Sequence, residues 1–160
     1  MPGQAFETYS FLDVQATLVA PGYTFDLASS GIAAEGIRIA MVGEKIATTI
    51  GADGDGMHTL IASQASNCEI TVLKSAPLNA MLNALYNFQT SSSANLGNIQ
   101  ITINNPAVGD TIFLVGGAMV KQADISYAEQ ATLNVWTFRF IARHDILGNG
   151  LNPLAIIIPA

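Results

Sequence analysis

Charged side chains, cysteines and long apolar runs are all scarce in this sequence. Only 11 % of the 160 residues are charged, whereas an ordinary soluble domain has about 25 %. Hydrophobic residues make up 50 % of the chain, and this proportion excludes an intrinsically disordered protein. A surface with so few charges exposes apolar side chains, which are typical of contact surfaces. We therefore expect the chain to associate with copies of itself.

The apolar runs are too short to cross a bilayer, because a spanning helix takes about 20 continuous apolar residues. The longest run, residues 112–120, contains Gly116 and Gly117. The N-terminus also lacks the basic and apolar stretches of a secretory signal, since Arg38 is the first basic residue. We expect the protein to be made and to assemble in the cytoplasm.

Cysteine and basic residues are similarly rare. Cys68 is the only cysteine, so no disulfide can form within the chain; its place in a predicted strand indicates a buried apolar side chain. The chain has six Lys and Arg against twelve Asp and Glu, which gives a net charge of −6. A protein that reads nucleic-acid sequence needs a basic patch to neutralise phosphates. This composition argues against that class.

Most of the chain is predicted to form β-strands, at residues 13–19, 57–62, 68–73, 99–104, 111–121 and 131–144. Apolar residues alternate with polar ones most clearly at 68–73 and 99–104, whereas residues 111–121 are mostly apolar. One amphipathic helix is predicted at residues 77–87, with Ser75 as its N-cap. Gly116 and Gly117 indicate a bulge or a close approach of two backbones. The predicted fold is mainly β, with one domain over residues 1–160: an antiparallel β-sandwich or barrel-like sheet flanked by one short α-helix.

Residues 37–50 predict a β-hairpin with Gly43 and Glu44 as its two-residue turn, because glycine supplies the positive φ of a type II′ turn. This register places the apolar side chains of the two strands on one face. The opposite face is small and polar, and consists of Arg38, Ala40, Lys45, Ala47 and Thr49.

Two segments show no regular period. Residues 22–36 are rich in Gly, Ala and Ser, and they are either a long binding loop or a disordered insertion. The C-terminal residues 151–160 are apolar and bounded by prolines. We expect this tail to dock on a surface.

The aspartates of the glycine-rich loop at residues 51–56 hint at a calcium site. Asp53 and Asp55 have the spacing of the first ligands of an EF-hand. The later ligand positions are occupied by Met57, His58 and Gln64, so the match fails. No Cys/His pair has the spacing of a zinc site. We predict no bound metal and no cofactor.

Catalytic motifs are missing from the sequence as well. There is no G-x-S-x-G motif, and Cys68 lies in the middle of a predicted strand rather than at a helix N-terminus. His144 and Asp145 would be half of a catalytic triad, but no nucleophile accompanies them. We predict that the protein is not an enzyme.

Four segments in succession resemble a known family. They are E-G-I-R-I at residues 35–39, T-T-I-G-A-D-G-D-G-M-H at 48–58, E-I-T-V-L-K-S-A-P-L-N at 69–79, and L-N-A-L-Y at 82–86. Their order is similar to that of the tail tube proteins of contractile-tailed bacteriophages, over roughly residues 9–148. The type VI secretion tube protein shares this architecture.

The resemblance implies a structural virion protein of the phage tail, assembled in the host cytoplasm. Its copies would form hexameric rings, and the rings would stack head to tail into a hollow tube for genome delivery. The implied partners are the tail sheath, tape-measure, terminator and baseplate proteins. DNA would pass through the lumen without sequence-specific binding.

The same resemblance gives roles to the residues singled out above. The expected lumen wall is the small and polar hairpin face together with Glu69 and Thr71, as part of a net-negative surface that repels phosphate. The expected turn and contacts between rings are Gly43, Glu44, Phe25, Leu27, Ile32, Leu154, Ile156 and Ile158.

Two other functions remain open at this stage. The chain could be the tube protein of a type VI secretion or bacteriocin-like contractile device, which carries effectors instead of DNA. It could also be a small β-sandwich domain that binds calcium or another ligand through Asp53 and Asp55.

Overall fold

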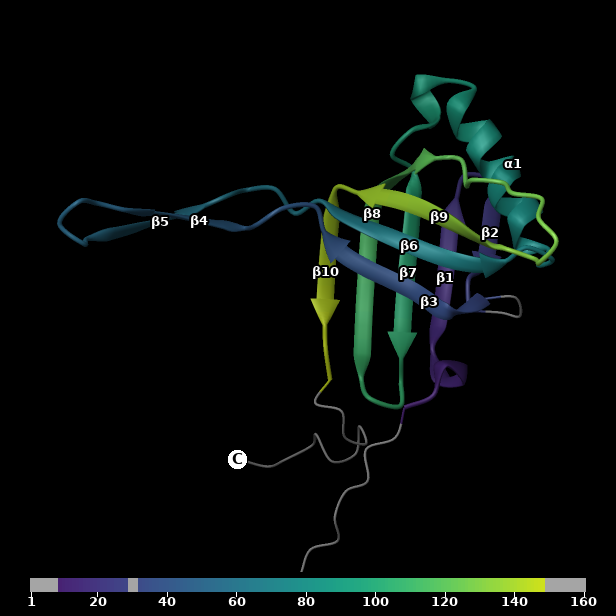
Figure 1. Ribbon diagram of the computed structural model, residues 1–160, viewed down its shortest axis with the longest axis horizontal. Coiled ribbons are helices and arrows are strands. Elements are labelled where there is room, and N and C mark those ends of the chain that lie inside the picture. Colours follow the sequence, from purple (N-terminus) through teal and green to yellow (C-terminus); the bar gives the residue numbers. More distant parts are fainter. Residues whose placement is uncertain (1–8, 29–31, 149–160) are drawn as a thin grey trace, which may run out of the picture.

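The computed structural model describes residues 9–28 and 32–148, and they form a β-sandwich whose two sheets cross (Figure 1). In the first sheet, β2 (Tyr23–Asp26), β1 (Gln15–Ala20), β7 (Ile99–Asn105) and β8 (Asp110–Lys121) are neighbours in that order, and β10 (Ala142–Ile146) pairs with β8. In the second sheet, β3 (Ile32–Met41), β6 (Ser66–Leu73) and β9 (Leu133–Phe140) lie side by side. All pairs are antiparallel. The predicted mainly-β class is confirmed.

Strand β8 belongs to both sheets, and two glycines mark the change. Its first half pairs with β7 and β10, and its last residues pair with β9. Gly116 has a φ of 68°, in the left-handed region that favours glycine. A Cβ atom on Gly117 would lie 2.9 Å from the carbonyl oxygen of Ile99. The predicted bulge and close backbone approach are confirmed.

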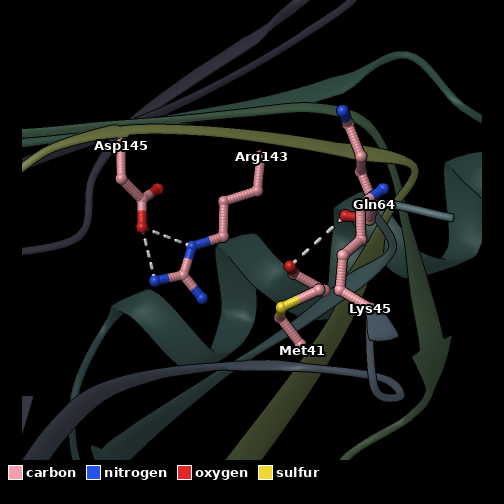
Figure 2. Close-up of a pocket in the computed structure, with 6 residues that line it drawn as sticks. Met41, Lys45, Gln64, Arg143 and Asp145 are labelled. Atoms are coloured by element: carbon pink, nitrogen blue, oxygen red, sulfur yellow. Dashed lines mark hydrogen bonds and ion pairs between the residues drawn. The ribbon is translucent and has the colours of Figure 1, made fainter. Parts of the chain in front are cut away.

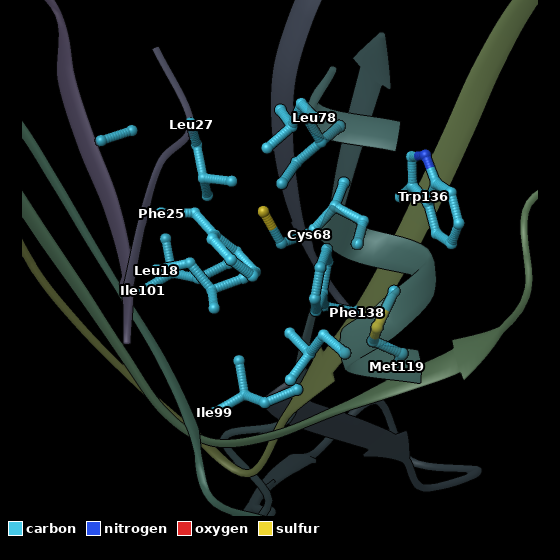
Figure 3. Packing of buried hydrophobic residues seen from close by; sticks show 14 of the residues in the cluster. Leu18, Phe25, Leu27, Cys68, Leu78, Ile99, Ile101, Met119, Trp136 and Phe138 are labelled. Carbon is cyan, nitrogen blue, oxygen red and sulfur yellow. The ribbon is translucent and has the colours of Figure 1, made fainter. Parts of the chain in front are cut away.

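The core lies between the two sheets, where alternate residues of each strand point inward (Figure 3). Leu18 of β1, Ile101 of β7 and Leu114 of β8 are fully buried. They face fully buried side chains of the second sheet, namely Cys68, Ile70, Val72, Phe138 and Phe140.

The helix α1 (Leu78–Thr90) covers one side of the sandwich beside β2 (Figure 1). It buries Leu78, Leu82 and Leu85, which recur at helical spacing as predicted. The predicted N-cap is wrong, because Pro77 occupies that position without a side-chain cap. With 13 residues α1 is too short to cross a membrane, and no other described helix reaches that length.

The predicted hairpin at residues 37–50 is wrong. Strand β3 pairs with β6, with Ile39 opposite Cys68, while β4 (Ile46–Ile50) pairs with β5 (Gly56–Leu60). Gly43 does not have a positive φ, so the type II′ turn does not form. Strand β3 pairs with β6 rather than with residues 46–50, because this pairing places the apolar side chains of β3 on the core side of the second sheet. The hairpin turn lies instead at the predicted loop 51–56, where Gly54 has a φ of 92°.

The loop prediction for residues 22–36 is also wrong for its described part. Tyr23–Asp26 form β2, which pairs with β1, and β3 begins at Ile32. Phe25 is 6 % exposed and Leu27 is fully buried. Their side chains therefore pack in the core of their own chain instead of between molecules.

Candidate functional site

The first candidate surface is the outward side of the second sheet, which we call the outer face. The register places Arg38, Glu69, Thr137 and Lys121 in one row across four strands, and Ala40, Asn67, Arg139 and Ala118 in the next. All of these side chains are small or polar. They point away from the core because their strand neighbours point into it.

Two of the three cations on the outer face lie near a carboxylate, and the third is hydrogen-bonded to an amide. Arg38 Nη1 lies 3.7 Å from Glu69 Oε2, and Lys121 Nζ lies 3.9 Å from Asp124 Oδ2. Arg139 Nε donates a hydrogen bond of 3.1 Å to Asn67 Oδ1. Such exposed pairs add little stability, but they leave few free charges for a polyanion.

The structure gathers part of the predicted lumen face. Three predicted residues lie together on the outer side of the second sheet: Arg38, Ala40 and Glu69. Thr71 belongs to the same side by its register, but it is only 9 % exposed, so it is not available as part of a surface. Lys45, Ala47 and Thr49 lie elsewhere, because the hairpin that joined them does not exist. This face does not carry the expected net negative charge. It has three cations, Arg38, Lys121 and Arg139, and two carboxylates, Glu69 and Asp124.

Sequence reasoning did not assign Thr137 and Arg139 to this surface. The signal was present in the alternation of residues 133–140, which places both opposite the buried Trp136 and Phe138. Assigning them to the face also requires knowing that β9 lies next to β6.

The second candidate surface is the arm, which consists of residues 42–65 and carries β4 and β5 at its centre. Figure 1 shows the arm projecting away from the sandwich. Every residue of both strands is exposed. Its large apolar side chains reach high exposure, with 65 % for Ile50, 62 % for Met57 and 72 % for Leu60.

The two strands of the arm are held together by their pairing with each other. Thr48 and His58 lie opposite each other, with 2.8 Å between Thr48 Oγ1 and His58 Nδ1. At the tip, the Gly51 N–H donates to the carbonyl of Asp55 at 2.7 Å. An isolated two-stranded hairpin is marginally stable in water. Exposed apolar side chains gathered on such a hairpin are typical of a contact surface.

The root of the arm is fixed by hydrogen bonds between its two sides. Lys45 Nζ donates to the carbonyl oxygens of Ala62 and Ser63 at 3.1 and 3.2 Å. Lys45 also accepts the Ile61 N–H at 2.8 Å through its own carbonyl. Lys45 thus has a structural role, because it joins the two sides of the arm at its root.

The hollow beside this root contains an ion pair on β10 (Figure 2). Arg143 Nη2 lies 2.5 Å from Asp145 Oδ2, and both side chains are about three-quarters buried. Met41, Lys45 and Gln64 line the same hollow. Arg143 and Asp145 are paired with each other, and the Lys45 ammonium donates to two backbone carbonyls, so each ionic group that lines the hollow already has a partner.

Catalytic and metal-binding groups do not converge in the described part of the chain. No group of three His, Cys, Asp or Glu side chains there could hold a metal ion. Asp53 Oδ1 accepts the backbone N–H of Asp55 at 3.1 Å, which closes the turn at the arm tip. Burial raises the pKa of the Cys68 thiol to about 12, and Glu69 contributes to the shift. This thiol is inert at neutral pH.

The remaining predicted contact residues are not placed by the structure. Leu154, Ile156 and Ile158 lie outside the described residues, and for Ile32 only the backbone is described. Gly43 and Glu44 lie at the root of the arm, next to Lys45.

Comparison with known proteins gives one family and one fold. The sequence model of the family described as "Bacteriophage PhiTE tail tube protein" matches residues 6–148. No curated protein sequence matches the chain. Among solved structures, a chain of the cryo-EM structure of the anti-feeding prophage (AFP) baseplate, 6-fold symmetrised, has a similar fold, with a TM-score of 0.50. The two chains are 12 % identical, and the alignment covers 91 % of this chain and 97 % of the other. At this identity the likeness concerns the fold alone.

Proposed function

Because this chain belongs to the bacteriophage PhiTE tail tube protein family, we propose that its copies form hexameric rings that stack into the inner tube of a phage tail. The tube would serve as the conduit for genome delivery. The tail tube role is structural, and we propose that the chain has no catalytic activity.

The observation that carries this proposal is the exposed apolar arm. Ile50, Met57 and Leu60 are each more than 60 % exposed on a two-stranded hairpin that lacks support from the body. Covering these side chains on a neighbouring copy would remove apolar area from water, at roughly 25 cal/mol for each Å². This gain supports association between copies.

We propose that the outer face lines the lumen. Two of its rows consist of small and polar side chains, and Arg38 and Lys121 each lie near a carboxylate. Exposed apolar side chains, namely Leu73, Leu133 and Val135, are confined to the end of the face at which β6 ends. Such a wall binds phosphate weakly because few unpaired cations remain. DNA would move along it without being held.

The proposed partners follow from a tube inside a contractile tail. They are the sheath protein around the tube, the tape-measure protein within it, and the terminator and baseplate proteins at its ends. We propose assembly in the host cytoplasm, with the apolar residues 151–160 contributing to contacts between copies.

Electron microscopy of the purified protein tests the proposal, together with sedimentation velocity. We expect rings or tubes for the wild-type chain and their loss in Ile50→Lys, which buries a charge at the contact. The matched control is Ile125→Lys, at an isoleucine that is 60 % exposed outside the arm. This control should assemble normally. A chain that stays monomeric at high concentration, even with tail initiation proteins present, contradicts the proposal.

A further inference from the structure

A groove of about 330 Å³ lies between β3 and the first sheet, along the edge of β3 that has no strand partner among the described residues. Ile37 and Ile39 of β3 form one wall of it. Ile103 of β7 and Ile112 of β8 also line it. Figure 1 shows that β7 and β8 continue past β3, with no described strand of the second sheet in front of them. The groove is therefore largely apolar.

The N-terminal part of the same chain also borders the groove. Tyr9, Phe11 and Val14 line it, and Phe11 belongs to the short 3-10 helix η1 (Phe11–Asp13). The Val14 N–H donates to the carbonyl of Phe11 at 3.0 Å. The Phe11 ring lies near β3, since a Cβ atom on Gly36 would be 3.7 Å from its Cε2. The groove is thus bordered by its own chain on several sides and has the size of a small-molecule site.

Two acceptor groups lie next to each other in this groove. Asn105 and Asp110 are opposite each other in the ladder of β7 and β8, and both line the groove. Asn105 is 6 % exposed, and its Oδ1 has no hydrogen bond among the described residues. A buried acceptor without a donor is unfavourable. A ligand that brings an N–H group to this oxygen therefore gains from the contact.

The carboxylate of Asp110 has no cationic partner. Its Oδ1 accepts the Gly148 N–H at 2.8 Å, and no ion pair joins it to a Lys, Arg or His side chain among the described residues. Arg143 lines the same groove, but its Nη2 lies 2.5 Å from Asp145 Oδ2. The negative charge of Asp110 is therefore the one that a ligand in the groove could neutralise.

We propose that this groove binds a small primary amine in its ammonium form. The ammonium group has three donors and no acceptor, so it can donate to the Asp110 carboxylate and to Asn105 Oδ1 together. The apolar body of the amine would lie among the isoleucine side chains. An anion would be repelled by Asp110, and a neutral apolar molecule would leave both acceptors unpaired. This inference goes beyond the tube role and does not depend on it.

Calorimetric titration of the purified full-length chain with hexylamine tests the proposal. Hexylamine is charged at neutral pH, because an alkyl amino group such as that of lysine has a pKa of about 10.4. We expect saturable binding of one molecule per chain. Hexanol has the same alkyl body without the charge and should bind about tenfold more weakly, or weaker still. No binding of hexylamine, or equal binding of hexanol, overturns the proposal.

Matched variants test the two acceptors. Asp110→Asn removes the charge but keeps an oxygen for the Gly148 N–H, and it should weaken hexylamine binding by about tenfold or more. The control is Asp124→Asn, at a carboxylate near Lys121 on the outer face, and it should bind hexylamine as the wild type does. Full affinity in Asp110→Asn, or an equal loss in the control, contradicts the proposal.

The NMR signals of the Asn105 side-chain amide give a test that needs no variant. They should shift in the wild-type chain as hexylamine is added and reach a limit at saturation. Signals that stay in place at saturation overturn the assignment of Asn105 as an acceptor.

A lysine side chain of a partner protein carries the same alkylammonium group, so the source of the amine needs its own test. Nα-acetyl-lysine methylamide represents such a side chain. We expect it to bind more weakly than hexylamine, because its shorter stem ends in polar amides that gain nothing from an apolar wall. A lysine derivative that binds as tightly as hexylamine assigns the groove to a partner's lysine and overturns the proposal of a small amine. Tube formation is scored separately by electron microscopy, so either proposal can fail alone.

Discussion

The indole Nε1–H of Trp136 donates a hydrogen bond of 3.0 Å to Oδ1 of Asn79. The same oxygen accepts from Asn134 Nδ2 at 3.1 Å, while Asn79 Nδ2 donates to the carbonyl of Leu73 at 2.8 Å. Asn79 lies in the first turn of α1, Trp136 and Asn134 belong to β9, and Leu73 ends β6. One amide side chain thus joins the helix to two strands of the second sheet.

Asn79→Ala should destabilise the fold by about 3 kcal/mol, because it leaves the buried donors of Trp136 and Asn134 unpaired. Urea unfolding followed by the fluorescence of Trp136, the only tryptophan, measures this loss. Asn87→Ala is the matched control on the exposed face of the same helix. It should change the free energy of unfolding by less than about 0.5 kcal/mol. Equal effects of the two variants would contradict the role of Asn79.

A second amide holds the other end of the helix to β8. Gln89 Nε2 donates to the carbonyl of Met119 at 2.8 Å, and Gln89 Oε1 accepts the Met119 N–H at 2.8 Å. Gln89→Leu keeps the side-chain volume but leaves both backbone groups of Met119 without partners. We expect a loss of about 2–4 kcal/mol, with faster hydrogen exchange at the Met119 amide. Unchanged exchange at that amide would show that the pair does not hold β8.

The strands with clean alternation were predictable because that signal is local. The period of two located β6 and β7, and the helical spacing of Leu78, Leu82 and Leu85 located α1. Gly116 and Gly117 marked the point at which β8 changes sheets. Each of these features depends on residues close together in the chain.

Strand partners were not predictable in the same way. The pattern of residues 37–50 fits a hairpin, but pairing with β6 places Ile37 and Ile39 against the core, and that choice depends on residues about thirty positions away. The short β2 was missed although Pro21 and Gly22 form its two-residue turn, with Ala20 opposite Tyr23.

The candidate site, too, was predictable where it depends on local alternation and not where it depends on strand partners. Arg38, Ala40, Glu69 and Thr71 were assigned to one surface because each alternates with core residues in its own strand. Placing Arg139 on the same surface required knowing that β9 lies next to β6 in the sheet. The exposed arm was not predicted, since a hairpin of alternating apolar residues usually packs on a core.

Replacing Gly117 or Gly43 with alanine should have different effects on the free energy of unfolding. A Cβ at Gly117 would lie 2.9 Å from the carbonyl oxygen of Ile99 and 2.6 Å from Phe140 Cδ1. Gly117→Ala should therefore cost about 1–3 kcal/mol through overpacking. Gly43 has no atom within 4 Å of its Cβ position and no positive φ. Gly43→Ala should be neutral within about 0.5 kcal/mol. Thermal unfolding of both variants measures the difference. A strongly destabilised Gly43→Ala would instead support the type II′ turn predicted from the sequence at residues 43–44.

Burial of Cys68 predicts how stability changes in alkali. The pKa of its thiol is raised from 9.0 to about 12 in the folded chain. Above pH 9 the unfolded chain releases this proton while the folded chain keeps it, so ionisation favours unfolding. The contribution of Cys68 to the free energy of unfolding should fall by about 1.4 kcal/mol per pH unit from pH 9 toward pH 12. Below pH 8 it should be independent of pH.

Cys68→Ala isolates that contribution from the other groups that titrate in alkali. Urea unfolding of both chains from pH 7 to 10.5 gives the difference in their free energies of unfolding. At neutral pH the wild type should be the more stable of the two, because alanine leaves a small cavity in the core. The gap should then narrow above pH 9 as the unfolded thiol ionises. A gap that stays constant up to pH 10.5 would mean that the thiol ionises equally readily in the folded chain, which contradicts its burial between Ile39 and Phe138.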